Sequence, residues 1–145
     1  MPYLYPTREA GRDFIMRGLA GPVVMLNLIR LRAVADYSDH PELAPAEPIS
    51  GREAYERYIA HTLPFLERSG GRLLFSGDGG GWLIGPAEER WDIALLVEQK
   101  DTATFLAFES DPDLMRGLGH RQAAIADSRL LPLAPAGPTG QVPHA

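Results

Sequence analysis

The 145-residue chain contains no cysteine, and this absence excludes several kinds of chemistry at once. Disulfide bonds, zinc–thiolate sites, iron–sulfur clusters and thiol nucleophiles all require a cysteine sulfur. Lysine is almost absent as well, because Lys100 is the only one. The remaining positive charge is arginine, scattered among acids in a chain of net charge −5, so we expect no nucleic-acid partner.

Long apolar runs are also missing from the chain. No such run approaches the roughly 18 residues needed to cross a bilayer, so we expect no membrane partner. The opening residues MPYLYPTREAG lack a basic segment followed by an apolar one, and no secretory signal is predicted. We therefore expect a cytoplasmic protein. The hydrophobic fraction of 45% is typical of a single globular domain with its own core.

Residues 23–31, VVMLNLIRL, are the clearest strand. Both its odd and its even positions begin apolar, so both faces of this strand must be covered. Asn27 interrupts the run. A buried amide without a partner costs roughly 1–3 kcal/mol, so we expect Asn27 to bind either the backbone or a ligand.

Turn residues and periodicity place the other elements around this strand. Ser50-Gly51-Arg52-Glu53 is a capping box that opens a long helix, and Asp111-Pro112 marks another helix start. A loop rich in proline and acids covers 36–49, where a lid or an interface is conceivable beside a simple solvated excursion. The further predicted elements are a helix over 7–19, strands over 72–76, 82–85, 91–98 and 128–133, the turn GDGGG, and a helical region from Asp101.

Without the first helix, the order of elements is βαββαβ. This order predicts an α+β fold of the ferredoxin-like kind, an antiparallel sheet with both helices on one face. The second apolar face then needs another layer, and a second copy of the chain would supply it as a dimeric α/β barrel. We expect a helical extension at 1–20, the α+β domain at 21–133, a flexible tail at 134–145, and a homodimer formed through the sheet face.

The residues that carry this pattern resemble a known family. The segments PVVMLNLIRLR, EAYERY, GGRLLFSG, IGPAEERWDIALLVE and HRQAAIADSRLL, in this order over residues 20–133, are similar to the bacterial family named domain of unknown function 1330. The resemblance implies the dimeric α/β barrel superfamily. It implies no activity, because that family has no common one.

Seven residues are candidates for ligand binding: Asn27, Arg30, Tyr55, Tyr58, Trp91, His120 and Arg121. Asn27 and Arg30 lie on opposite faces of a regular strand, and Asp92 is a plausible ion-pair partner of Arg30. Tyr55 and Tyr58 share one helix face, where they either pack in the core or point their hydroxyls into a pocket.

His120 is the catalytic candidate, either as a general base or as a haem ligand. The alternative is that His120 and Arg121 only tie a helix end to the last strand. Haem-degrading monooxygenases of this superfamily use an asparagine, a tryptophan and a histidine, which Asn27, Trp91 and His120 would match. Those enzymes place the tryptophan and the histidine much closer together in sequence, so haem is the weaker alternative.

No motif in the chain indicates a cofactor or a metal. The GDGGG turn fits no phosphate-binding loop, the four histidines lack metal-ligand spacing, and no G-x-S-x-G motif is present. Three classes of function remain. They are a dimer that binds a small organic molecule between sheet and helices, a cofactor-independent monooxygenase or isomerase, and a scaffolding dimer.

Overall fold

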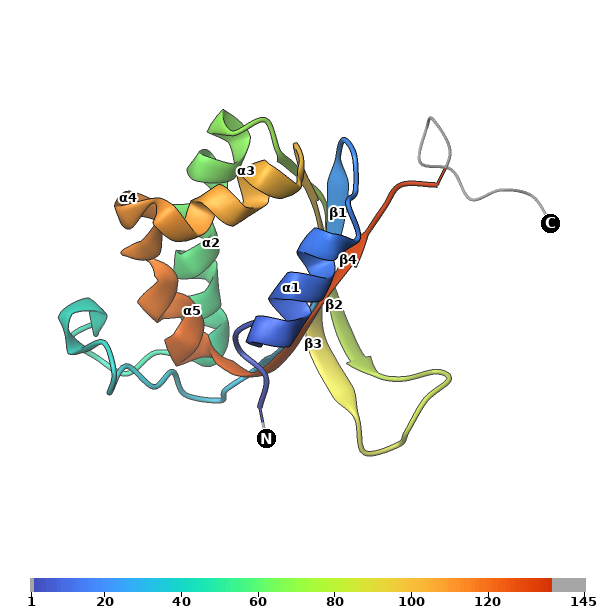
Figure 1. Cartoon of the computed structure of the whole chain (residues 1–145). Helices are drawn as coiled ribbons and strands as arrows, with labels where there is room; N and C mark the ends of the chain where they lie inside the picture. Colours follow the sequence, from blue (N-terminus) through green and yellow to red (C-terminus); the bar gives the residue numbers. More distant parts are fainter. Residues whose placement is uncertain (1, 137–145) are drawn as a thin grey trace.

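The computed structural model describes residues 2–136, arranged as in Figure 1. Residues 137–145, most of the predicted tail, lie outside the described part. One antiparallel sheet has the strand order β2-β3-β1-β4, which confirms the ferredoxin-like α+β fold. The strands are β1 Val23–Leu31, β2 Arg72–Gly81, β3 Arg90–Gln99 and β4 Ile125–Leu133. The helices are α1 Arg8–Met16, α2 Gly51–Arg68, α3 Thr102–Ala107, α4 Pro112–Met115 and α5 Leu118–Ala124, with 3₁₀ turns at Pro41–Leu43 and Phe108–Ser110.

Side-chain caps explain where four of the helices begin, and for α4 the cap is the predicted Asp111, whose carboxylate accepts hydrogen bonds from the amides of Asp113 and Leu114. In α2, the Ser50 hydroxyl accepts a hydrogen bond from the backbone amide of Glu53 at 3.0 Å. In α1 and α3, the Thr7 and Asp101 side chains accept hydrogen bonds from backbone amides in the first turn in the same way. Each cap satisfies an amide that has no partner inside the helix. Helix α1 is shorter than the predicted 7–19, because the chain leaves the helix at Gly18, whose φ is +59°.

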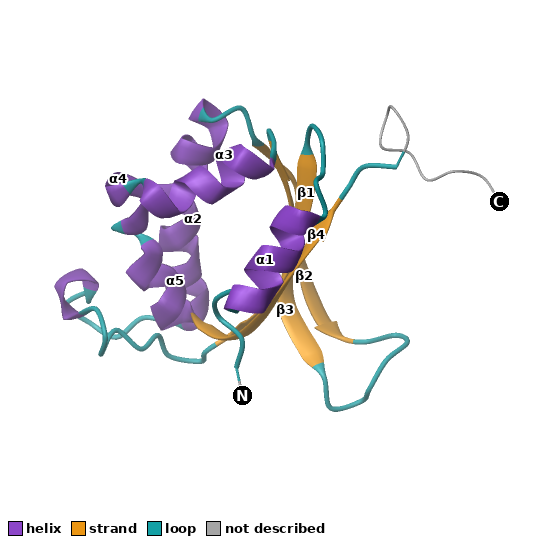
Figure 2. Ribbon diagram, viewed as in Figure 1, coloured by secondary structure: helices purple, strands orange, loops and turns teal. Residues whose placement is uncertain are grey.

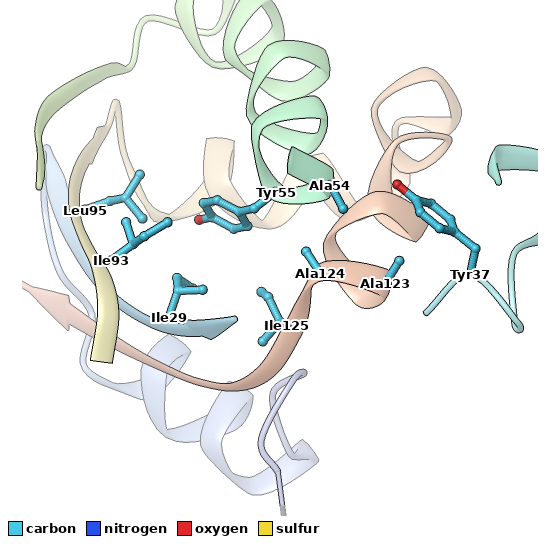
Figure 3. Close-up of a cluster of buried hydrophobic side chains, with 9 residues drawn as sticks. All are labelled: Ile29, Tyr37, Ala54, Tyr55, Ile93, Leu95, Ala123, Ala124 and Ile125. Atoms are coloured by element: carbon cyan, nitrogen blue, oxygen red, sulfur yellow. The ribbon is translucent and has the colours of Figure 1, made fainter. Parts of the chain in front are cut away.

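The helices cover one face of the sheet, as Figure 2 shows in purple against orange. Along β1 the side chains that face them are the odd-numbered ones, with Met25 and Ile29 almost fully buried. The larger core cluster lies between sheet, α2 and α5 (Figure 3), and its members are Ile29, Tyr37, Ala54, Tyr55, Ile93, Leu95, Ala123, Ala124 and Ile125.

Helix α1 belongs to a second, smaller cluster on the same face. Its Phe14 is buried with Val23 and Met25, and it meets Phe105 of α3 edge-on at 6.0 Å between ring centroids. The predicted extension therefore contributes part of the core.

The residues before α1 run along β4. The backbone amide of Ser128 donates to the carbonyl of Tyr3 at 3.1 Å, and the amide of Tyr3 donates to the Asp127 carboxylate at 2.8 Å. This segment covers part of the edge strand that would otherwise expose unpaired backbone groups.

The opposite face of the sheet carries an apolar row and has no helix over it (Figure 2). Leu26 is paired with Leu96 on β3 and with Leu131 on β4, and Leu96 is paired with Phe75 on β2. These four residues, called the apolar row below, alternate with the buried positions and so point away from the helices. Phe75 is 57% exposed and Leu131 is 53% exposed.

The β2–β3 hairpin differs from its predicted form. The glycines of GDGGG do not make a turn but continue β2 to Gly81, where Gly80 and Gly81 pair with Trp91 and Arg90. Residues 82–85, predicted as a strand, instead belong to the connecting loop. Pairing with β3 overrides the local preference of glycine for turns. Strand β4 also begins three residues earlier than predicted, at Ile125.

Candidate functional site

A tyrosine and a histidine from distant parts of the chain form a direct pair. The hydroxyl of Tyr37, in the loop after β1, lies 2.7 Å from Nδ1 of His120 on α5. The two rings meet edge-on, with centroids 5.5 Å apart. Tyr37 is only 9% exposed, and in Figure 3 it lies across α5 from the sheet. The pair has the groups that proton transfer requires.

Further polar contacts fasten the 36–49 loop to α5. Nε2 of His40 lies 2.8 Å from Oε1 of Gln122, and the Gln122 amide donates to Asp39 at 3.0 Å. Gly119 makes this close approach possible, because a Cβ there would lie 2.6 Å from Leu43 and 2.8 Å from His40. The loop is therefore a strap held on the outer side of the helix layer.

Burial and charge both act on the Tyr37–His120 pair. Burial lowers the pKa of His120, and the positive charge of Arg57 and the neighbouring His61 on α2 lower it further. Burial raises the pKa of the Tyr37 hydroxyl. Near neutral pH the imidazole is therefore neutral, and a single proton lies between its Nδ1 and the tyrosine hydroxyl across the 2.7 Å contact.

We expect the pair to make stability depend on pH. Below about pH 6.5 the unfolded chain binds a proton on His120 that the folded protein disfavours, so the free energy of unfolding falls as the pH drops. His120→Asn keeps an acceptor near Nδ1 and removes the titration. Urea unfolding from pH 7.5 to 5.0 should show a steeper loss for the wild type than for this variant. Parallel pH profiles would contradict the prediction.

The two predicted tyrosines of α2 belong to the core between sheet and helices. Tyr55 is 5% exposed and points toward Ile93 and Leu95 (Figure 3), and burial raises the pKa of its hydroxyl. Tyr58 is half-buried, with its ring centroid 5.7 Å from that of Tyr55. The space between sheet and helices is thus occupied by core side chains at this point.

Asn27 has a local backbone partner. Its Nδ2 donates to the carbonyl oxygen of Met25 at 3.2 Å. Along the helix-facing side of β1 it stands between Met25 and Ile29, which belong to the two different core clusters. The amide therefore marks the boundary between these clusters, and one of its two N–H groups has a backbone partner.

Arg30 and Trp91 lie together where β1 ends and β3 begins. The guanidinium of Arg30 donates to the carbonyl of Arg90 at 3.1 Å and lies 4.9 Å from the ring centroid of the buried Trp91. The ion pair expected between Arg30 and Asp92 is not formed. Asp92 instead accepts the amide of Leu31 at 2.8 Å and pairs with Arg90, its near neighbour on β3, at 3.2 Å.

Arg121 has a structural role at the N-terminal segment. It donates to the carbonyl of Leu4 at 2.7 Å and reaches the hydroxyl of Ser128 on β4 at 3.5 Å. It points toward different partners from its neighbour His120.

Asn27, Trp91 and His120, the set considered for haem, likewise bind separate partners, and the structure gives them no common site.

Two surface hollows lie elsewhere, and no predicted site residue lines either of them. The first, of about 330 Å³, is lined by Phe65, Arg68, Ser69, Thr104, Ala107, Phe108 and Asp111. The second, of about 390 Å³, lies between the end of α1 and the start of α3 and is lined by Ile15, Gly18, Leu19, Asp101, Thr102, Ala103 and Leu106.

Within residues 2–136, no cluster of histidines and acids is arranged to hold a metal, and no helix is long and apolar enough to cross a membrane.

Sequence analysis did not identify Tyr37, His40 or Gln122. Tyr37 and His40 lie in a loop whose proline and acid content indicates only that it is irregular. Gln122 is an ordinary helix residue. The one local signal was the glycine beside His120, since a glycine inside a helix often marks a close contact.

The solved structures similar to this chain are of proteins of unknown function. No family model matches it, and no curated protein matches it. The fold is similar to that of a dimeric ferredoxin-like protein of unknown function from Jannaschia sp. CCS1, with a TM-score of 0.50 and 14% identity over 78% of this chain and 98% of that one.

A much nearer solved structure is that of RPA0582 from Rhodopseudomonas palustris, a protein of unknown function. The TM-score is 0.82, with 37% identity over 95% of this chain and 100% of the other. A second structure, of methylated RPA0582, gives the same TM-score and identity over 94% and 97% of the two chains. Identity at this level over a full chain shows that the present protein belongs to the same family as RPA0582.

Proposed function

We propose that the protein works as a homodimer in which two copies pack sheet to sheet as an α/β barrel. The observation that carries this proposal is the apolar row, Phe75, Leu96, Leu26 and Leu131, which crosses all four strands on the face without helices. A contiguous apolar surface of this kind marks an interaction site in a globular protein. A two-fold axis would bring the apolar row of one copy against the apolar row of the other, so the same surface can serve both copies in a symmetric interface.

Two further points support this assembly. The Jannaschia protein with the same fold is described as dimeric. The resemblance to domain of unknown function 1330 implies the dimeric α/β barrel superfamily as well.

The test is the native mass of the purified protein in solution. Light scattering after size exclusion should give twice the mass of one 145-residue chain. A mass of one chain at all concentrations would overturn the proposal.

A second candidate function is the binding of a small, largely apolar molecule in the hollow between α1 and α3. The Thr102 hydroxyl, which lines this hollow, is buried and has no hydrogen-bond partner among the residues that the structure describes. Leu19 and Leu106 supply apolar walls, and a volume of about 390 Å³ falls in the range of ligand sites. Buried polar groups normally have partners, and we propose that a ligand seated in the hollow supplies the partner of this hydroxyl.

Thr102→Val tests this second candidate. The variant keeps the shape of the side chain, so we expect a free energy of unfolding within about 1 kcal/mol of the wild type. Binding of indole, followed by NMR chemical shifts, should weaken about tenfold because the hydroxyl partner is lost. Thr62→Val on α2, which removes another buried hydroxyl without a partner among the described residues but lines neither hollow, is the matched control. Equal indole affinity in all three proteins would contradict a site here.

A further inference from the structure

The most exposed apolar side chains of the described chain are at the tip of the β2–β3 hairpin. Leu83 is 100% exposed and Ile84 is 91% exposed, and the adjacent Trp82 is 43% exposed. Single exposed apolar residues are common on protein surfaces, but consecutive ones at one protruding tip are characteristic of an interaction site.

The tip has a defined shape. Gly85 takes a φ of +156°, and a Cβ on it would lie 2.5 Å from the Trp82 indole, which folds back over the turn. The amide of Glu89 donates to the carbonyl of Pro86 at 3.2 Å, and the Trp91 indole donates to the Glu89 carboxylate at 3.3 Å. The loop therefore presents Leu83 and Ile84 in a preformed turn, which lowers the entropy lost when they bind.

The direction of the hairpin indicates the side from which a partner comes. In Figure 1 the hairpin leaves the body of the sheet on the side away from α2, α3, α4 and α5. This is the side that carries the apolar row. Phe75 of that row and the 42% exposed Leu74 lie on β2, the same strand that leads to the tip. Between Phe75 and the tip, β2 carries only Ser76, Asp78 and glycines, so the exposed apolar side chains of the hairpin form two groups, one on the open sheet face and one at the tip.

We propose that the hairpin tip docks on the second copy of the chain, so that each copy holds the other with Leu83 and Ile84. This inference rests on the homodimer proposed above. In the proposed dimer, the second copy packs on the apolar row. It would therefore lie on the same side of the sheet toward which the tip projects, and this makes a second copy the partner of the tip. A membrane is a poorer partner, since Glu88 and Glu89 stand beside the tip and anionic lipids would repel them.

The absence of cysteine allows a direct test of this contact. Leu83→Cys introduces the only thiol of the chain, and its alkylation by a maleimide reports whether the tip is covered. We expect alkylation about tenfold slower at protein concentrations where the dimer predominates than at concentrations where the monomer does. Met16→Cys, on α1 and 75% exposed, is the matched control, and its alkylation rate should not change with concentration.

A second variant measures how much the tip contributes to dimer affinity. The double substitution Leu83→Ser and Ile84→Ser should raise the dimer Kd about 100-fold in sedimentation equilibrium, since two apolar side chains per tip lose their burial. Met16→Ser with Val34→Ser, at positions 75% and 60% exposed on α1 and in the loop after β1, should leave the Kd unchanged.

The outcomes separate the two proposals. A wild-type dimer with an unchanged Kd in the tip variant and concentration-independent alkylation would overturn the docking of the tip and leave the sheet-to-sheet dimer standing. A monomeric wild type would overturn both. Protection of the Leu83→Cys thiol by phosphatidylcholine vesicles at monomer concentrations would assign the tip to a lipid surface and overturn the inference.

Discussion

Replacing Gly51 with alanine should lower the free energy of unfolding by about 3 kcal/mol, because a new methyl group there has no space. Gly51 is the first residue of α2, and its amide donates to the carbonyl of Arg32 at 3.1 Å. A Cβ on Gly51 would overlap that carbonyl oxygen and lie 2.9 Å from the carbonyl oxygen of Ala124. Both obstacles are backbone, so a rotamer change cannot relieve the clash.

Gly11→Ala is the control for this experiment. Gly11 lies in α1, and nothing is within 4 Å of a Cβ placed on it. We expect this variant to gain roughly 0.5–1 kcal/mol, the ordinary preference of a helix for alanine over glycine. Urea unfolding followed by circular dichroism measures both. If Gly51→Ala were as stable as the wild type, the close junction of β1, α2 and α5 would be refuted.

Leu26→Glu should convert the proposed dimer to monomers. Leu26 is in the centre of the apolar row, between Leu96 and Leu131. In a symmetric dimer the substitution would bury two carboxylates near each other without partners. Burying an unpaired charge costs several kcal/mol, so the dimer Kd should rise about 1,000-fold.

The monomer itself should remain folded in this variant, because the apolar row faces away from the helices and their core. Sedimentation equilibrium gives the Kd, and circular dichroism checks the fold. Met16→Glu adds the same charge at a 75% exposed position of α1 and should leave the Kd unchanged. A Leu26→Glu protein that stayed dimeric would show that the two copies associate through another surface.

Local sequence signals predicted most of the fold because they act over a few residues. Strand β1 has the predicted bounds, and Ser50 caps α2 as its spacing indicates. The hairpin was harder, since five residues of GDGGG resemble a turn until β3 pairs with them. The next strand along the chain decided that element, because its pairing partners lie 9 to 17 residues beyond these glycines and outside the turn itself.

The candidate site was less predictable for a related reason. His120 was a candidate, but its partner Tyr37 is 83 residues away, in a loop without periodicity. The sequence also could not show that His120 and Arg121, neighbours on α5, would point to different partners. Side-chain direction at the end of a short helix depends on what packs around it, and here that is the strap on one side and the N-terminal segment on the other.

The pairing of the N-terminal segment with β4 has a consequence for the order of folding. The bond from Tyr3 to Asp127 joins residues 124 positions apart, nearly the greatest separation the described chain allows. During synthesis the first residues leave the ribosome long before their docking strand exists, so they wait unpaired while the rest of the sheet assembles. Contacts of such long range are slow to form. We therefore expect the β4 edge to close late in folding, after Ser128 has been synthesised.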